Sequence, residues 1–233
     1  SDGDIAVSLD ANGLVLTGDT TGDDIMIVGS VPVTVYGADG DNIITGALGD
    51  DTIEGGSGDD TIDGNVGDDT ITGGAGDDTI DGGANNDIAI FAGNQADYTF
   101  ESSADGLTVT ITDTVNNDVD TVTGVETLRF DDGDIAVSLD ANGLVLTGDT
   151  DGDDITIVGS VPVTVVGADG DDEIIGGSGN DIIEGNAGND TIEAGSGADT
   201  IDGGDGDDHI DGWSGNDVID GGDGDDEIYG YDG

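Results

Sequence analysis

Residues 55–63 read GGSGDDTID and residues 73–81 read GGAGDDTID. The same nine-residue pattern runs from Gly37 to Ile90 and again from Gly167 to Tyr229, which gives 13 copies. Position 4 is glycine, position 6 is aspartate and position 8 is isoleucine in 12 of the 13 copies each. Such regularity at a fixed short period indicates a stack of equivalent structural units rather than a merely biased composition.

Each position of the repeat has a physical role. Glycines at positions 1, 2 and 4 allow a tight turn. Positions 7 to 9 are typical of a short strand, in which only position 8 points inward. One nonapeptide cannot bury its isoleucine alone, so two of them are expected to form an 18-residue coil. Stacking such coils at about 4.8 Å predicts an all-β, parallel solenoid.

This stacking brings like charges together. Every second turn lies on the same edge, so Asp51 is expected over Asp69 and Asp60 over Asp78. Carboxylates a few ångströms apart repel each other unless a cation lies between them. The donors on offer are carboxylate and carbonyl oxygens, because the chain has no cysteine and one histidine. Flexible sites made only of oxygen favour Ca²⁺ over Zn²⁺, Cu²⁺ or Mg²⁺.

The pattern GGxGxDxUx, with U a large apolar residue, resembles the RTX (repeats-in-toxin, haemolysin-type) calcium-binding nonapeptide. It covers 117 of the 233 residues. The resemblance implies a right-handed parallel β-roll with Ca²⁺ between its turns, in a bacterial protein exported by type I secretion. On the order of nine ions or more are expected. The position-6 ligands that it implies are Asp51, Asp60, Asp69, Asp78, Asp87, Asp172, Asp181, Asp190, Asp199, Asp208, Asp217 and Asp226.

Three further ligands are predicted at the margins of the motif. Asn42 replaces the position-6 aspartate of the first nonapeptide and is expected to offer an uncharged carbonyl oxygen, which makes a weaker site. Continuing the nine-residue register upstream gives a degenerate coil at 19–36 and another at 149–166. In these coils Asp24 and Asp154 fall at position 6. Asp24 is therefore expected to stack on Asn42, and Asp154 on the aspartate 18 residues later.

A longer repeat contains the short one. Residues 1–40 match residues 131–170 at all but four positions. We therefore expect a first unit at 1–90, with a strand pair ahead of its roll, and a second copy of the unit at 131–233. The intervening 91–130 is expected to be a small β-hairpin insert or cap. The duplication favours a segment of a larger tandem array.

The charge of the chain restricts its partners. It carries 56 acidic residues and Arg129 as its one Lys or Arg, for a formal net charge of −55. Nucleic acids and anionic lipids need basic residues to neutralise them, so neither is an expected partner. No run approaches the ~20 apolar residues of a membrane span. Composition alone would favour disorder, and it is the periodic pattern that argues for a fold.

These features favour a calcium-binding structural segment of a secreted bacterial surface or extracellular protein, such as an adhesin, a surface-layer component or a matrix fibre. Self-association and cell-surface or matrix partners remain open. The alternative is the calcium-dependent folding and secretion module of an RTX enzyme or toxin whose active domain lies elsewhere. An ice- or carbohydrate-binding face would need regular threonine rows, which the second block lacks. We expect no enzymatic activity, because paired acids that recur a dozen times are unlike one catalytic pair.

Overall fold

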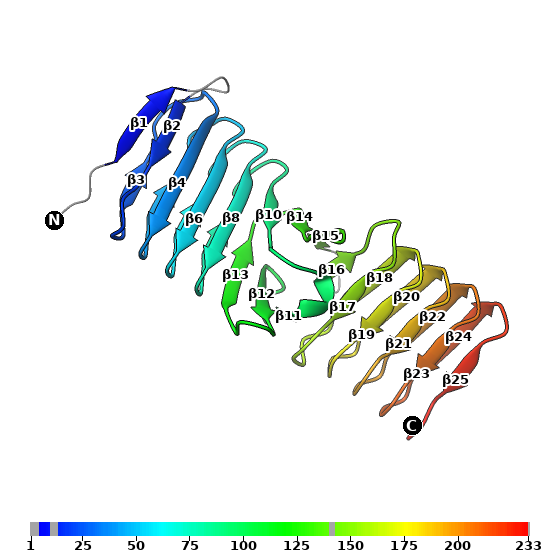
Figure 1. The fold of residues 1–233 in the computed structure, drawn as a ribbon. Coiled ribbons are helices and arrows are strands. Elements are labelled where there is room, and N and C mark those ends of the chain that lie inside the picture. Colours follow the sequence, from blue (N-terminus) through cyan, green and yellow to red (C-terminus); the bar gives the residue numbers. More distant parts are fainter. Residues whose placement is uncertain (1–4, 10–13, 140–142, 233) are drawn as a thin grey trace. The chain divides into compact units, whose positions relative to one another are not determined.

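The computed structural model describes residues 5–9, 14–139 and 143–232 (Figure 1). The chain forms two compact units. The first comprises residues 1–92 and 110–129, and the second comprises residues 93–109 and 130–233. The described part contains no helix that is long and apolar enough to cross a membrane.

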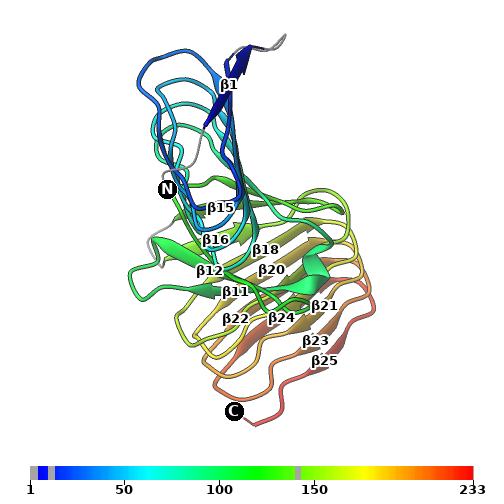
Figure 2. The ribbon, with the colours of Figure 1, turned by 60° about the vertical axis from the view of Figure 1, so that its left-hand side comes forward.

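The first unit is a solenoid in which the chain alternates between two sheets (Figure 2). One sheet has, in spatial order, β1 (Ala6–Leu9), β2 (Leu14–Thr17), β4 (Val33–Asp39), β6 (Thr52–Ser57), β8 (Thr70–Ala75), β10 (Ile88–Ile90) and β14 (Thr127–Arg129). The other has β3 (Asp24–Met26), β5 (Ile43–Thr45), β7 (Thr61–Asp63), β9 (Thr79–Asp81) and β13 (Val119–Thr123). Apart from the antiparallel β1–β2 pair, these strands pair in parallel.

The second unit repeats this plan. One sheet has β15 (Asp134–Leu139), β16 (Leu144–Thr147), β18 (Thr164–Asp169), β20 (Ile182–Ala187), β22 (Thr200–Asp205) and β24 (Val218–Asp223). The other has β17 (Asp154–Thr156), β19 (Glu173–Ile175), β21 (Thr191–Glu193), β23 (His209–Asp211) and β25 (Glu227–Tyr229). Again an antiparallel pair, β15–β16, precedes parallel strands. The all-β parallel solenoid predicted from the nonapeptides is therefore confirmed.

The core is a single file of side chains from each sheet. Ile53, Ile62, Ile71 and Ile80 stand at position 8 of successive nonapeptides, and each is at most 1% exposed. Burying one such side chain stabilises the fold by about 1.5–3 kcal/mol. Ala89, the smaller exception at this position, is also fully buried. Because each coil contributes only two such side chains, the rest of its stability must come from the backbone ladders and the turns.

Residues 91–130 do more than cap a roll. The predicted hairpin turn is present, since the Ser103 amide donates to the Thr108 carbonyl at 2.9 Å. It follows the 3₁₀ helix η1 (Gln95–Asp97) and β11 (Tyr98–Ser102), and it leads into β12 (Thr108–Asp113). However, β13 pairs in parallel with β9, and β14 pairs in parallel with β10. Residues 119–129 therefore complete a further coil of the first unit, which the nonapeptide period did not predict.

Candidate calcium ladder

The position-6 aspartates form hydrogen-bonded ladders along each unit. The backbone amide of Asp51 donates to Asp69 Oδ1 at 2.7 Å, and the amide of Asp69 donates to Asp87 Oδ1 at 2.8 Å. In the second unit the amide of Asp172 donates to Asp190 Oδ1 at 2.9 Å in the same way. Each carboxylate thus accepts from the amide of the residue 18 positions before it in the sequence, which lies one coil earlier in the stack. The expected stacking of these aspartates is present in both units.

The second carboxylate oxygen of most of these aspartates has no partner. Asp69 and its equivalents are at most 2% exposed from Asp51 to Asp208. A buried carboxylate oxygen without a donor or a cation is costly. Among the described residues, such unpartnered Oδ2 atoms belong to Asp60, Asp69, Asp78, Asp87, Asp172, Asp181, Asp190, Asp199, Asp208 and Asp217.

Most of these oxygens lie beside the glycine at position 1 of their nonapeptide, in what we call a cradle. A methyl group placed on Gly64 would lie 2.6 Å from Asp69 Oδ2 and 2.5 Å from the Gly82 carbonyl oxygen. Asp69 Oδ2 and the Gly82 carbonyl oxygen therefore lie close together beside Gly64. Both are oxygen donors of the kind that Ca²⁺ takes as ligands. Gly203, with Asp208, builds the same cradle in the second unit. A side chain at Gly64 or Gly203 would collide with these oxygens, whereas the nonapeptide of Asp199 has Ala194 at the equivalent position.

The donor set fits calcium. Nowhere in the described residues do three or more His, Cys, Asp or Glu side chains converge as a metal cluster. The cradles beside Gly64 and Gly203 instead combine a carboxylate with a main-chain carbonyl oxygen. Such mixed oxygen ligands are typical of Ca²⁺ and unlike the nitrogen and sulfur ligands of zinc sites.

Burial also changes the charge state of the ladder. It raises the pKa of Asp69, Asp78 and Asp172 to about 7, because desolvation disfavours the ionised carboxylate. Neighbouring carboxylates of the ladder raise the pKa of Asp69 further, Asp51 and Asp87 among them. A bound cation would reverse this effect by stabilising the charged form.

A family model provides the decisive comparison. The RTX calcium-binding nonapeptide repeat model matches residues 19–53, 36–70, 54–89, 164–192, 184–219 and 214–233, together more than half of the chain. The chain belongs to this RTX repeat family. Its repeats are accordingly calcium-binding, and the aspartate ladders and glycine cradles are where this chain would hold the ions.

Two other comparisons add little. No curated protein matches the chain. Among solved structures, the extracellular lipase LipA from Serratia marcescens matches with 24% identity and a TM-score of 0.26. The match covers 78% of this chain and 32% of the lipase, so this chain spans about a third of that protein's length.

The RTX ladder departs from the sequence-based register at its N-terminal ends. Asp23, not Asp24, stacks on Asn42, since its amide donates to Asn42 Oδ1 at 2.8 Å. Asp153, not Asp154, donates to Asp172 Oδ1 in the same way. The positions predicted for Asp24 and Asp154 are therefore wrong by one residue.

The reason is one extra residue in the half-turn after β3. Ten residues separate the inward Ile25 from Val35, whereas nine separate Val35 from Ile44. The additional residue lies in the loop that contains Gly29 and Pro32. It shifts the upstream coil, so Ile25 is buried and Met26 is 76% exposed.

Asn42 is placed differently from a calcium ligand. Its Oδ1 accepts from the Asp23 amide, which can only donate, so the orientation of the side-chain amide is fixed. Its Nδ2 then donates to the carbonyl oxygens of Gly40 and Gly55 at 2.7 and 3.4 Å, and to Asp60 Oδ1 at 3.0 Å. A nitrogen donor therefore fills this cradle. The amide nitrogen of Asn42 therefore takes the place that a carboxylate oxygen holds in the other cradles, and the weak calcium site at Asn42 stays a prediction.

Replacing Asn42 with aspartate tests this interpretation. The N42D variant should bind one more calcium ion than the wild type, because it restores the carboxylate that other cradles have. It should need a higher calcium concentration than the wild type to reach its folding midpoint, because the neutral amide is gone. Native mass spectrometry and circular dichroism measure the two effects. N86D, which adds a charge at an exposed position, is the control and should gain no ion.

Other ladder ends are closed by protein donors. Asp51 Oδ2 accepts from the Ala47 amide at 2.6 Å, so this predicted ligand has a partner already. In the second unit, Gln95 Nε2 donates to Asp153 Oδ1 at 2.8 Å, and Asp149 donates its amide to Asp153 Oδ2 at 2.9 Å. The carboxylates of Asp51 and Asp153, at the N-terminal ends of their ladders, therefore have hydrogen-bond donors for both oxygens without a cation. At the other end, Asp217 and Asp226 are more exposed than the aspartates before them.

Besides Asp23 and Asp153, three further ladder residues were absent from the sequence-based prediction. Asp120 Oδ1 accepts from the Asp78 amide at 2.8 Å, and Glu126 Oε2 accepts from the Asp87 amide at 2.8 Å. Gln95 is the third. A signal existed for Asp120, because residues 120–124 read DTVTG and repeat the DTIDG that links neighbouring nonapeptides. Glu126 and Gln95 lie in no recognisable pattern.

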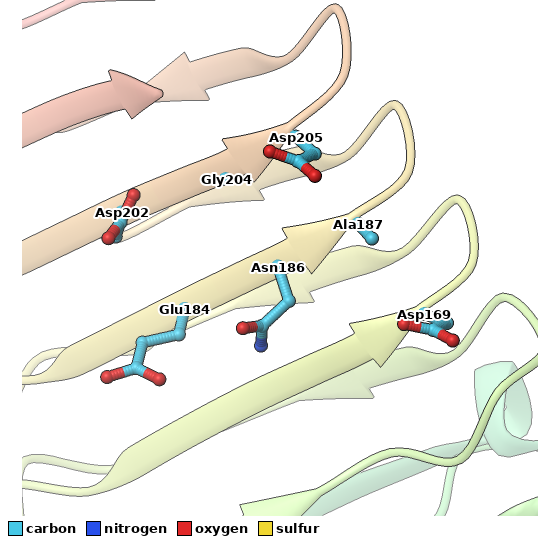
Figure 3. A pocket seen from close by; sticks show the side chains of 7 residues that line it. All are labelled: Asp169, Glu184, Asn186, Ala187, Asp202, Gly204 and Asp205. Atoms are coloured by element: carbon cyan, nitrogen blue, oxygen red, sulfur yellow. The ribbon is translucent and has the colours of Figure 1, made fainter. Parts of the chain in front are cut away.

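A second acidic feature lies on the outer face of the second unit. A groove of about 380 Å³ runs over β18, β20 and β22 (Figure 3). Glu184 pairs in register with Asp202, and Asp205 lies farther along the same strand. No buried, unpartnered oxygen of the described residues points into this groove. It is therefore a solvated acidic face, distinct from the inner ladders.

Proposed function

We propose that this chain is a calcium-folded structural segment of a secreted bacterial surface or extracellular protein, without catalytic activity of its own. The observation that carries the proposal is the ladder of buried carboxylates with unpartnered oxygens, repeated in two copies of one unit. Single ligand sites serve catalysis or sensing, whereas a ladder that runs the length of both rolls serves the fold itself. Metal-binding energy then becomes folding energy.

The charge explains how calcium would gate folding. A net charge of −55 opposes compaction. Stacked carboxylates add local repulsion along each roll. At low calcium the chain remains expanded, which suits export as an unfolded chain. At the higher calcium of an extracellular medium, the ions neutralise the ladders and the coils close.

The duplication favours an array over an accessory module. Two nearly identical copies of residues 1–40 in one chain are typical of extended repeat proteins, which provide reach or assembly. The alternative is the folding and secretion module of an RTX enzyme or toxin. The full-length gene product distinguishes the two: further units of this kind support the array, and a catalytic domain supports the module.

Calcium titration tests the gated fold. Starting in chelator, far-ultraviolet circular dichroism should show a cooperative gain of β signal as Ca²⁺ rises. Size exclusion should show a smaller hydrodynamic radius at the same midpoint. Mg²⁺ at equal concentration should produce neither change, because it gives up its water shell reluctantly. A chain that is already compact in chelator would contradict a calcium-gated fold.

A further inference from the structure

The last coil of the first unit is closed by residues outside the nonapeptides. Thr121 pairs with Thr79, and Thr123 with Asp81, although 42 residues separate the members of each pair. The Gly82 amide donates to the Thr123 carbonyl oxygen at 3.0 Å, just as the Gly64 amide donates to the Asp81 carbonyl oxygen at 2.8 Å. The segment Thr123–Gly124 thus takes the place that the next nonapeptide would occupy.

This replacement rebuilds the glycine cradle. A methyl group on Gly82 would lie 2.9 Å from Asp87 Oδ2 and in close contact with the Gly124 carbonyl oxygen. Asp87 is fully buried, and its Oδ2 has no hydrogen-bond partner. The arrangement is the same as the cradle beside Gly64, with Gly124 supplying the carbonyl oxygen that Gly82 supplies there. An unpartnered buried carboxylate oxygen and a main-chain carbonyl oxygen therefore lie together beside Gly82, as they do beside Gly64.

Glu126 supplies the second carboxylate of this coil. Its Oε2 accepts a hydrogen bond from the Asp87 amide at 2.8 Å. Asp87 Oδ1 accepts from the Asp69 amide in the same way, one coil earlier. In a nonapeptide the ladder aspartate comes five residues after the cradle glycine, as Asp87 comes after Gly82. Glu126 comes only two residues after Gly124. The longer glutamate side chain reaches the ladder from this shortened segment.

We propose that Asp87, the Gly124 carbonyl and Glu126 form a Ca²⁺ site that the nonapeptide motif does not encode. The inference rests on calcium binding by the repeats. The ion would lie between the last nonapeptide and the residues that follow the hairpin. It would thereby fasten residues 119–129 to the roll, so calcium would order this non-repetitive segment as well.

A double-variant experiment on the full chain tests the shared site. E126Q keeps an oxygen that can accept from the Asp87 amide but removes the charge. D87N is expected to fold, since Asn42 shows how an amide fills a cradle. Each variant should bind one ion fewer than the wild type by native mass spectrometry, at a calcium concentration that just saturates the wild type. The double variant should lose the same single ion.

Hydrogen exchange gives a local readout. Calcium-dependent protection of residues 119–129 should fall in E126Q, whereas that of residues 46–72 should stay. E54Q makes the same chemical change on the exposed face of β6 and should behave as wild type. Wild-type stoichiometry and protection in E126Q, or two ions lost from the double variant, would overturn this site alone. A wild-type chain that binds no calcium would overturn the proposed function and the site with it.

Discussion

In chelator, lowering the pH from about 8 to about 5 is expected to restore much of the β structure that calcium removal abolishes. Burial raises the pKa of Asp69, Asp78 and Asp172 to about 7, against an ordinary value of 3.8. The folded state therefore binds more protons than the unfolded chain between these values. Its stability in chelator must then rise as the pH falls through about 7, and be lost as the pH rises again.

Calcium should reverse the sign of this dependence. Ligand carboxylates must be deprotonated to bind the ion, so protons compete with calcium. The calcium concentration at the folding midpoint should therefore increase as the pH falls from about 8 to about 6. Circular dichroism across a grid of pH and calcium concentrations measures both effects in one experiment.

General charge repulsion is the competing explanation for acid-induced folding. A control at about pH 8 in chelator with high sodium chloride screens repulsion without protonating the ladder. If salt alone restores the β signal, the ladder carboxylates are not the cause. An acid transition centred near the ordinary aspartate pKa of 3.8 would likewise contradict the role of burial.

The nonapeptide blocks were predictable because their pattern is redundant. Glycine, aspartate and isoleucine positions each constrain the same register, so one exception such as Ala89 or Asn85 leaves the coil unchanged. From the isoleucine spacing alone, both the strands and the stacking of Asp60 over Asp78 follow. The structure adds the unpartnered oxygens and the cradles, which depend on turn geometry that spacing does not describe.

The errors have a common physical cause. Upstream of the blocks the pattern keeps only an aspartate followed two residues later by an inward apolar residue. Both Asp23 with Ile25 and Asp24 with Met26 fit this spacing. Burial of Ile25 decides between them, and one extra loop residue accommodates the choice. At Glu126 the ladder is completed by side-chain length instead of sequence spacing, and no periodic analysis can detect that. Where the repeat ends, tertiary contacts rather than the motif determine the ladder.

Substitutions of Asp69 should separate the two roles of a ladder aspartate. D69A removes Oδ1, which leaves the buried Asp51 amide without its 2.7 Å acceptor, and also removes Oδ2 from the cradle beside Gly64. The unpaired amide alone costs about 1–3 kcal/mol. The bound calcium is lost as well, so D69A should show a clearly lower melting midpoint and at least one ion fewer.

The D69N variant isolates the ion from the hydrogen bond. Its amide oxygen can accept from Asp51, and its nitrogen can donate to the Gly82 carbonyl, as Asn42 donates to Gly55. D69N should therefore lose an ion and melt between D69A and wild type in calcium, and it should be more folded than wild type in chelator. D63A removes one exposed charge from the same block and serves as the control. If D69A and D63A gave equal melting midpoints and equal ion counts, the inner ladder could not be the calcium site, because a buried ligand and a solvated carboxylate would then be energetically equivalent.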